Sequence, residues 1–242
     1  MYWMMILITR PKTEAKKLKT LLEDLGHRTH IDSLSKISFS GSKKNFYFKS
    51  IVLISSQQAA KIFTKNYLGP KNLPLVIVGN VSYHKLISSG FSNILYKAKD
   101  SRQILKYLKK EYSSLKNKYG NKLSYLTGSI TNKKFITDLR SIGFKFEKKA
   151  IYKTSFKKSF APATIALLKK NKIHICLLYS QQNARQFCEL IRKKNLSKNC
   201  NNLLIVTISR SISDLMKKNG FINVKNSAYP SQQSLLNLLE RL

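Results

Sequence analysis

The chain has 242 residues, of which 45 are Lys or Arg and 11 are Asp or Glu, so its formal charge at neutral pH is +34. Hydrophobic residues make up 43% and aromatic residues 10%, which is enough for a core and excludes a disordered basic tail. The length allows one large domain or two small ones. The apolar opening, residues 1–8, is shorter than the roughly 20 residues that cross a bilayer, and it lacks the basic leader of a signal peptide.

Short apolar runs alternate along the chain with segments that have helical periodicity. The first run, residues 6–8, precedes an expected helix at 14–25. The later runs, each followed by a helical pattern, are 51–54, 75–78, 123–126, 173–178 and 203–208. Strands that alternate with helices predict an α/β fold, in which parallel sheets carry helices on their faces.

The sequence also resembles itself. Residues 56–63 (SQQAAKIF) are similar to 180–187 (SQQNARQF), and each segment follows an apolar run. Residues 90–94 are similar to 220–224, and a Lys-Lys pair stands at the same spacing before Gly26 and Gly143. These echoes predict two copies of one α/β unit, each made of an A segment and then a B segment.

Partly alternating stretches separate A from B in each copy, and we interpret them as extended linkers. If the linkers lie side by side, the first A segment shares a lobe with the last B segment. The predicted division is a first lobe of 1–33 with 157–242, linker strands at 34–48 and 149–156, and a second lobe of 49–148. Covalent order alone leaves open two sequential lobes.

Ligands of parallel sheets bind beyond the carboxyl ends of the strands. Those ends carry small hydroxyl and amide residues that begin helices, where backbone N–H groups are free to bind anions. The candidate substrate-binding residues are Thr9, Arg10, Ser55, Ser56, Gln57, Ser82, Thr127, Gly128, Ser180, Gln181, Ser209 and Ser211. Helix capping explains any one of them, but their recurrence at six strand ends of a two-copy chain favours a polar cleft for a large anion.

Other kinds of site have little support in the sequence. It contains no Gly-x-Gly-x-x-Gly or P-loop motif, and no two acidic residues form a catalytic dyad. His27 and His30 have metal-ligand spacing without a third ligand nearby. Cys176, Cys188 and Cys200 are widely spaced, which favours structural thiols in a reducing cytoplasm. No metal site is predicted, so catalysis must use hydroxyls, amides, backbone N–H groups and cations.

Taken in order, these segments resemble the uroporphyrinogen-III synthase (HemD-like) family nearly end to end. The matching segments are 6–11 (ILITRP) with the helix-ending Gly26, then 51–63, 77–82 (IVGNVS), 150–154 (AIYKT), 173–187, 203–220 and 230–236 (PSQQSLL). Their order and spacing carry the resemblance. It implies two HemD-like α/β lobes, each a parallel sheet flanked by helices, joined by a two-stranded linker.

The resemblance also implies an activity. It implies a lyase that needs no cofactor or metal and cyclises hydroxymethylbilane to uroporphyrinogen III, with loss of water and inversion of the last pyrrole ring. The family's linker tyrosine falls on Tyr152, which we interpret either as the donor to the leaving hydroxyl or as an aromatic packing residue. The family's Thr and Gly of the last turn fall on Ile212 and Ser209, and these two departures bear on efficiency. Arg10 is either structural or a carboxylate contact.

The expected partner is therefore a small, flexible, polyanionic tetrapyrrole, which a basic site rich in N–H groups can fold and hold. We expect a cytoplasmic monomer without a membrane or nucleic-acid partner. Two alternatives remain open. The charge of +34 would suit a nucleic-acid-binding protein, although only 8 of the basic residues are Arg. A two-lobed tetrapyrrole-binding module without catalysis is the other, and Ile212 is its best support.

Overall fold

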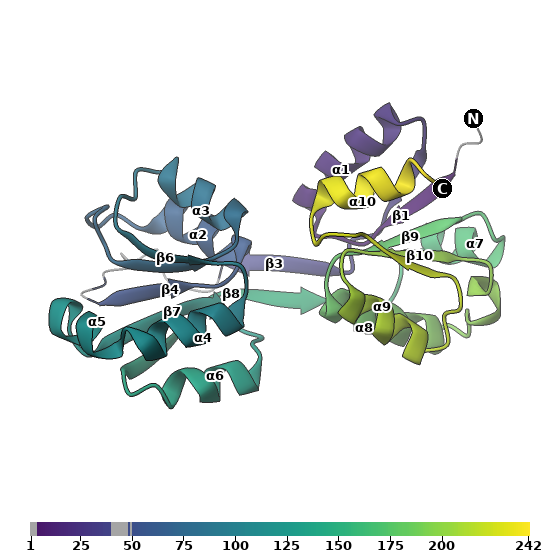
Figure 1. Ribbon diagram of the computed structural model, residues 1–242. Coiled ribbons are helices and arrows are strands. Elements are labelled where there is room, and N and C mark those ends of the chain that lie inside the picture. The colour runs from purple at the N-terminus through teal and green to yellow at the C-terminus, as the bar shows by residue number, and fades with distance from the viewer. Residues whose placement is uncertain (1–3, 40–47, 49) are drawn as a thin grey trace. The chain divides into compact units, whose positions relative to one another are not determined.

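The computed structural model describes residues 4–39, 48 and 50–242. Three groups of residues lie outside this description: 1–3 of the predicted first lobe, 40–47 of the predicted first linker, and residue 49. The chain divides into two compact units. Unit 1 comprises Met1–Lys36 and Ser155–Leu242, and unit 2 comprises Ile37–Thr154 (Figure 1).

Unit 1 is built on a five-stranded parallel sheet in the order β11-β10-β9-β1-β2. Its strands are β1 (Met5–Ile8), β2 (Arg28–Ile31), β9 (Ile175–Leu178), β10 (Leu204–Thr207) and β11 (Val224–Asn226). Its helices are α1 (Lys12–Asp24), α7 (Pro162–Lys169), α8 (Gln181–Lys193), the 3-10 helix η1 (Lys198–Cys200), α9 (Arg210–Lys218) and α10 (Gln232–Leu239). One face of the sheet packs against α1 and α10, and the other against α7, α8 and α9 (Figure 1).

Unit 2 is built on a six-stranded sheet in the order β3-β8-β7-β4-β5-β6. Its strands are β3 (Ser35–Phe39), β4 (Ile51–Ile54), β5 (Leu75–Val78), β6 (Ile94–Ala98), β7 (Lys122–Gly128) and β8 (Lys145–Phe156). The first two residues of β3 and the last two of β8 belong to unit 1. Its helices are α2 (Gln57–Asn66), α3 (Asn80–Ile87), α4 (Ser101–Lys110), α5 (Tyr112–Tyr119) and α6 (Lys133–Arg140). Helices α2 and α3 cover one face, and α4, α5 and α6 cover the other (Figure 1).

The edge strand β3 runs antiparallel to β8. The N–H of Lys157 donates to the carbonyl of Leu34, the Ser155 hydroxyl to the carbonyl of Lys36, and the Ser38 hydroxyl to the carbonyl of Lys153. Residue numbers therefore rise along one strand as they fall along its neighbour. The remaining pairs of the sheet are parallel. The predicted α/β fold with parallel sheets and covering helices is confirmed, and the sheet of unit 2 has this antiparallel strand added at its edge.

The two sheets share one strand order. Numbered along the chain from β4, the five parallel strands of unit 2 have the order 3-2-1-4-5. Numbered from β9 and ending with β1 and β2, the strands of unit 1 have the same order. Each sheet therefore reverses its direction of winding at one place, between β4 and β7 in unit 2 and between β9 and β1 in unit 1. Ligands of open α/β sheets bind at such reversals.

The core follows from the apolar runs. Strands β4 and β5 have the bounds predicted from sequence, and β4 is buried along its whole length because helices cover both faces. The repeated segments begin α2 and α8, where Phe63 and Phe187 are both fully buried. The predicted helix at 14–25 is α1, which buries Ala15, Leu18 and Leu22.

Candidate active site

In unit 2, the strand ends at the reversal carry four of the predicted site residues. Ser55 and Ser56 follow β4, and Thr127 and Gly128 end β7. Because β4 and β7 are parallel neighbours, their carboxyl ends meet at one edge of the sheet. Thr127 is buried, whereas Ser55 and Ser56 are half-buried.

Two serine–tyrosine pairs lie at this edge, one on each face of the sheet. Side chains alternate along a strand, so Ser55 continues the β4 residues that pack under α4 and α6, and Ser56 continues those under α2 and α3. The Ser55 Oγ lies 2.7 Å from the hydroxyl of Tyr125. The Ser56 Oγ lies 3.2 Å from the hydroxyl of Tyr152. Tyr152 therefore presents its hydroxyl at the end of β4 and the beginning of α2.

An irregularity in strand pairing turns Tyr152 toward α2. Thr127 pairs with Ala150, but the next residue, Gly128, pairs with Tyr152, so Ile151 is an extra residue in β8. Adjacent residues of a regular strand point to opposite faces, yet Ile151 and Tyr152 both pack on the cluster beneath α2 and α3. A β-bulge re-aims a side chain in this way, and bulges are common beside active sites.

Gly128 lies directly beneath the ring of Tyr152. A Cβ atom on Gly128 would come within 2.6 Å of Cε2 and 2.7 Å of Cζ of that ring. Gly128 is not among the glycines with positive φ, so this position requires space and not unusual backbone conformation. The N–H of Ser129 donates to the carbonyl of Tyr152 at 2.8 Å, which holds the two strands together at this point.

Ser56 is also the N-cap of α2. Its Oγ accepts the backbone N–H of Ala59 at 3.1 Å, the usual capping bond. A hydroxyl has one proton and two lone pairs, so Ser56 can bond to Tyr152 as well. Burial raises the pKa of Tyr152 above its ordinary value of 10.0, although the Ser56 hydrogen bond opposes the rise. Tyr152 is therefore protonated at neutral pH and can donate. Gln57, which follows Ser56, is exposed.

In unit 1, the reversal between β9 and β1 brings together Thr9, Arg10, Ser180 and Gln181. Thr9 is fully buried, and its hydroxyl donates to the carbonyl of Leu177 at 2.9 Å. Ser180 caps α8 by accepting the N–H of Asn183 at 3.2 Å. Ser180 and Gln181 are both exposed. The N-terminus of α8 thus faces solvent, while Thr9 fastens the end of β1 beneath it.

Arg10 is held by an aromatic ring and an amide. Its guanidinium carbon lies 4.1 Å from the ring centroid of Tyr179, a cation–π contact. Its Nη1 donates to Oε1 of Gln232, the first residue of α10, at 2.9 Å. Burial raises the pKa of Tyr179 to about 12, although Arg10 opposes the rise. A guanidinium has five N–H donors, so an oriented Arg10 has donors left for an anion.

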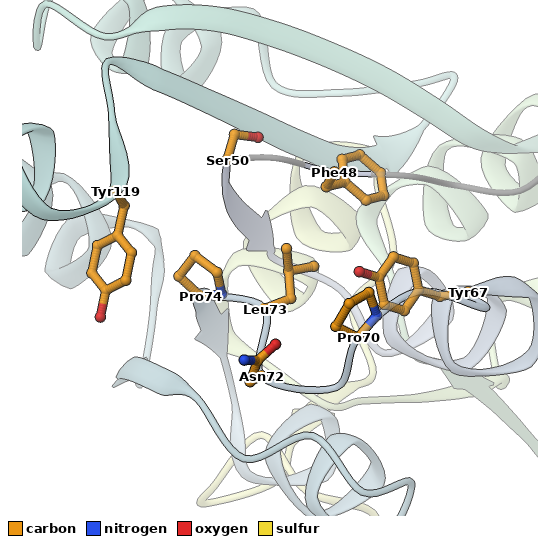
Figure 2. A pocket seen from close by; sticks show the side chains of 8 residues that line it. All are labelled: Phe48, Ser50, Tyr67, Pro70, Asn72, Leu73, Pro74 and Tyr119. Atoms are coloured by element: carbon orange, nitrogen blue, oxygen red, sulfur yellow. The ribbon is translucent and has the colours of Figure 1, made fainter.

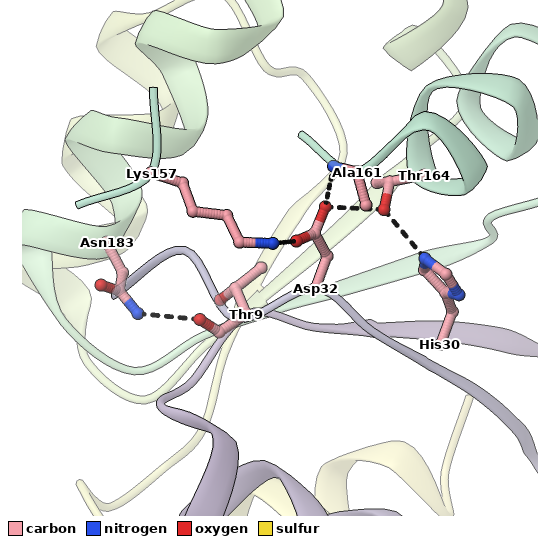
Figure 3. A network of polar contacts seen from close by, with 7 residues as sticks. All are labelled: Thr9, His30, Asp32, Lys157, Ala161, Thr164 and Asn183. Atoms are coloured by element: carbon pink, nitrogen blue, oxygen red, sulfur yellow. Dashed lines mark hydrogen bonds and ion pairs between the residues drawn. The ribbon is translucent and has the colours of Figure 1, made fainter. Parts of the chain in front are cut away.

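Asp32, directly after β2, fastens α7 to the sheet of unit 1 (Figure 3). Its carboxylate accepts hydrogen bonds from Lys157 Nζ at 2.5 Å, from the Ala161 N–H at 2.8 Å and from Thr164 Oγ1 at 2.7 Å. Burial alone would raise the pKa of Asp32, but these three bonds outweigh it and lower the pKa below 3.8. Asp32 is a buried, ionised group with a structural role.

His30 extends this network. Thr164 gives its one hydroxyl proton to Asp32, so it must accept from His30 Nε2–H, which lies 2.8 Å away. Burial lowers the pKa of His30 below 6.5; Lys157 acts in the same direction and Asp32 opposes it. Within residues 4–39, 48 and 50–242, no group of three His, Cys, Asp or Glu side chains is placed to hold a metal ion.

The remaining predicted residues follow β5 and β10, the strands next to each reversal. Ser82 lies in the first turn of α3 and is 1% exposed. Ser209 precedes α9, and its Oγ lies 3.2 Å from that of the exposed Ser211. Ile212, 3% exposed, packs in the core with residues of α8 and α9. Its side chain adds apolar packing where the sequence resemblance places a threonine.

Three contacts at these edges were not predicted from the sequence, those of Tyr125, Tyr179 and Gln232. Tyr125 lies inside an apolar run and looks like a core residue, and it is indeed 4% exposed. Tyr179 ends the run before Ser180, and Gln232 belongs to the last helix. For the two tyrosines, the available signal was an aromatic residue near the end of an apolar run that is followed by a polar turn.

Two hollows in the described part of the chain lie away from these strand ends. One of about 230 Å³ is lined by residues that include Ser50, Tyr67, Pro74 and Tyr119 (Figure 2). Ser50 and Pro74 immediately precede β4 and β5, so this hollow is at the amino ends of the strands.

Every helix within the described residues is too short or too polar to cross a bilayer.

Comparison with known proteins gives a consistent result. Residues 16–237 match the model of a family described as uroporphyrinogen-III synthase HemD. A solved uroporphyrinogen-III synthetase from Helicobacter pylori is similar with a TM-score of 0.65 at 15% identity, covering 98% of both chains. A mutant uroporphyrinogen III synthase from Thermus thermophilus gives a TM-score of 0.63 at 12% identity and the same coverage. At these identities the structures show a shared fold. The curated protein sequences give no match.

Proposed function

The chain belongs to the uroporphyrinogen-III synthase (HemD) family, lyases of haem biosynthesis, and we propose how its residues carry out the reaction. The substrate is hydroxymethylbilane, which is closed to uroporphyrinogen III with loss of water and inversion of the last pyrrole ring. Tyr152 is the proton donor to the departing hydroxyl. The observation that carries this assignment is the placement of the Tyr152 hydroxyl, 3.2 Å from Ser56 Oγ at the reversal of the sheet.

The departing group explains why one phenol suffices. When the C–O bond of the hydroxymethyl group breaks, its electron pair stays on oxygen, which acquires the basicity of hydroxide. The pKa of bulk water is about 15.7, far above that of a tyrosine, so proton transfer from Tyr152 to this oxygen is favourable. Closing the ring displaces a proton from a pyrrole carbon, and that proton restores Tyr152. The net change is loss of one water.

The exposed strand-end residues bind the substrate carboxylates in this proposal. Gln57, Ser180, Gln181 and Ser211 lie at helix starts, where free N–H groups and the helix dipole favour anions. Arg10 adds an oriented cation. The buried members, Thr9, Ser82, Thr127 and Gly128, support the strand ends from below. Ser55 and Ser209 are half-buried and complete the two edges.

We extend the proposal to the setting in which the protein works, a monomer in a reducing cytoplasm. Cys176, Cys188 and Cys200 are buried free thiols. Burial raises the pKa of both Cys188 and Cys200 to about 11, so they are protonated and inert at neutral pH. Residues 34–48 and 149–156 are the proposed linker between the lobes 1–33 with 157–242 and 49–148.

An isomer-resolved assay tests the proposed function. The protein is incubated with hydroxymethylbilane, the porphyrinogens are oxidised, and the type I and type III porphyrins are separated by chromatography. We expect predominantly type III product, at a rate that rises in proportion to enzyme. Type I alone, equal to the enzyme-free control, would reject the function. If the protein then bound hydroxymethylbilane tightly without turnover, a non-catalytic binding module would replace the synthase.

A further inference from the structure

The position of the Tyr152 ring is set by Gly128 beneath it and by the β-bulge beside it. Gly128 lies under the ring, where a Cβ atom would come within 2.6 Å of Cε2 of Tyr152, so the ring edge occupies space that only a glycine leaves free. The β-bulge at Ile151 brings the ring onto the face of the sheet that carries Leu126 and, at the same periodicity, Gly128. The bulge therefore directs the Tyr152 ring into the space that Gly128 leaves free.

The hydroxyl is held from the other side. Ser56 Oγ is fixed by its capping bond from Ala59 N–H at 3.1 Å and lies 3.2 Å from the Tyr152 oxygen. A capped serine has little freedom to rotate away, because the start of α2 would lose its bond. When Ser56 donates to the phenol oxygen, the phenol proton is left to point at a substrate.

We propose that Gly128 and Ser56 are positioning residues of the synthase reaction, Gly128 by making room for the ring of Tyr152 and Ser56 by fixing its hydroxyl. Neither needs to touch the substrate. This assignment rests on the proposed function, since it presumes that the Tyr152 hydroxyl meets the departing oxygen. It goes beyond that function by naming what sets the position of the donor.

Gly128→Ala is the principal test, with Gly69→Ala as its matched control. A Cβ on Gly69 would meet the ring of Tyr67 at 2.5–2.6 Å, a similar clash in the same unit but at the amino ends of the strands. A displacement of about 1 Å can cost about 100-fold in rate. We expect Gly128→Ala to lower kcat by about that factor with KM changed less than about twofold, and Gly69→Ala to leave kcat unchanged.

A thermal-unfolding cycle tests the same contact without substrate. Gly128→Ala should lower Tm by about 3–6 °C in the wild-type background. It should lower Tm much less in a Tyr152→Ala background, because the ring it displaces is absent. Equal losses in both backgrounds would overturn the role of Gly128, as would an unchanged kcat. If wild type forms only type I product, the proposed function fails, while this cycle still decides whether Gly128 holds the ring.

Ser56→Ala tests the hydroxyl contact. We expect kcat to fall about fivefold in wild type and not to fall further in a Tyr152→Phe background, where the phenol oxygen is absent. Asp100→Ala is the control for capping, because Asp100 caps α4 through the N–H of Gln103 at 3.0 Å and lies outside the site. Equal kcat losses from Ser56→Ala in both backgrounds, or the same loss in Asp100→Ala, would overturn the role of Ser56.

Discussion

Strands β2 and β8 occupy the same place in two sheets of one topology, last in the order 3-2-1-4-5. In unit 1, β2 has four residues and leads to Asp32, an ionised carboxylate that accepts hydrogen bonds from Lys157, Ala161 and Thr164. In unit 2, β8 has twelve residues and carries Tyr152, a neutral phenol with one partner 3.2 Å away. The carboxylate of Asp32 is occupied by structural hydrogen bonds, whereas the phenol of Tyr152 keeps a proton that it can donate to a ligand.

The difference shows how one architecture separates stability from chemistry. Asp32 uses its charge to satisfy backbone and side-chain donors, which gains stability only if the carboxylate stays ionised. Tyr152 is supported by packing instead, through the bulge and the space above Gly128, so its hydroxyl is positioned without being saturated. A sheet end that is to act on a ligand must keep such a donor.

Replacing the carboxylate should have the largest effect on stability. Asp32→Asn puts an amide N–H₂ or a neutral oxygen against Lys157 and leaves donors of Ala161 or Thr164 poorly paired. Breaking a buried charged network costs about 3 kcal/mol, and Lys157 is partly exposed, so we expect about 2–3 kcal/mol lost in urea unfolding at pH 7. Asp214→Asn, at an exposed position of α9, is the control and should change stability by less than about 0.5 kcal/mol.

The sign of the pH dependence sharpens this test. The folded pKa of Asp32 is lowered, so the ionised carboxylate favours the folded state above the unfolded pKa, near 3.8. That contribution is lost as the pH falls through the lower, folded pKa. The gap between wild type and Asp32→Asn should therefore narrow under acid conditions. A gap that is the same at pH 7 and pH 3 would contradict an ionised Asp32.

Tyr152→Phe should have the largest effect on turnover. A positioned proton donor contributes about 100-fold or more, so we expect kcat to fall by at least about 100-fold, equivalent to about 2.7 kcal/mol. The unfolding free energy should change by less than about 1 kcal/mol, because the ring remains and one hydrogen bond is lost. Tyr112→Phe removes a hydroxyl that bonds to the Gly143 carbonyl at 3.0 Å and is the control. Unchanged turnover in Tyr152→Phe would remove Tyr152 from the mechanism.

The buried strands and the repeats could be predicted from the sequence because their signals are local. Strands β4 and β5 are continuous apolar runs bounded by Ser, Gly or Pro, and their bounds were predicted correctly. Strand β2, with the sequence Arg-Thr-His-Ile, is a partly exposed edge strand without an apolar pattern, and it was not predicted. An edge strand is specified by its neighbour in the sheet, which its own residues do not reveal.

The partners within the site depend on strand order, which is not local. Tyr125 reaches Ser55 from 70 positions away, and Gln232 reaches Arg10 from 222. The role of Asp32 was not predicted, since its donors lie more than 120 positions along the chain. The roles assigned to Tyr152 and the strand-end residues remain predictions, for which the geometry gives the means of testing.

Arg10 tests whether unit 1 also contributes to binding. Arg10→Gln removes the charge and the contact with Tyr179. A hydrogen bond to a charged group contributes about 1.5 kcal/mol, so we expect KM to rise about tenfold with kcat changed less than about twofold. The control is Arg241→Gln at the exposed C-terminal end. Loss of stability with an unchanged KM would instead make Arg10 a purely structural residue, on the same side of the comparison as Asp32.

The smallest expected effect is on the pH dependence of stability, through His30 in β2. The folded pKa of His30 is lowered below 6.5, so as the pH falls the unfolded chain takes up a proton before the folded chain does. Stability from neutral His30 is therefore present above pH 6.5 and lost below it, by up to about 1 kcal/mol at pH 5.5. His30→Gln keeps an N–H donor for Thr164 but does not titrate, so its stability should fall less between pH 7.5 and 5.5 than that of wild type. His84→Gln, at an exposed position of α3, is the control for the loss of a histidine. Parallel curves for wild type and His30→Gln would mean that protonation of His30 does not destabilise the fold. The contrast between unit 1 and the neutral donor Tyr152 would then rest on Asp32 alone.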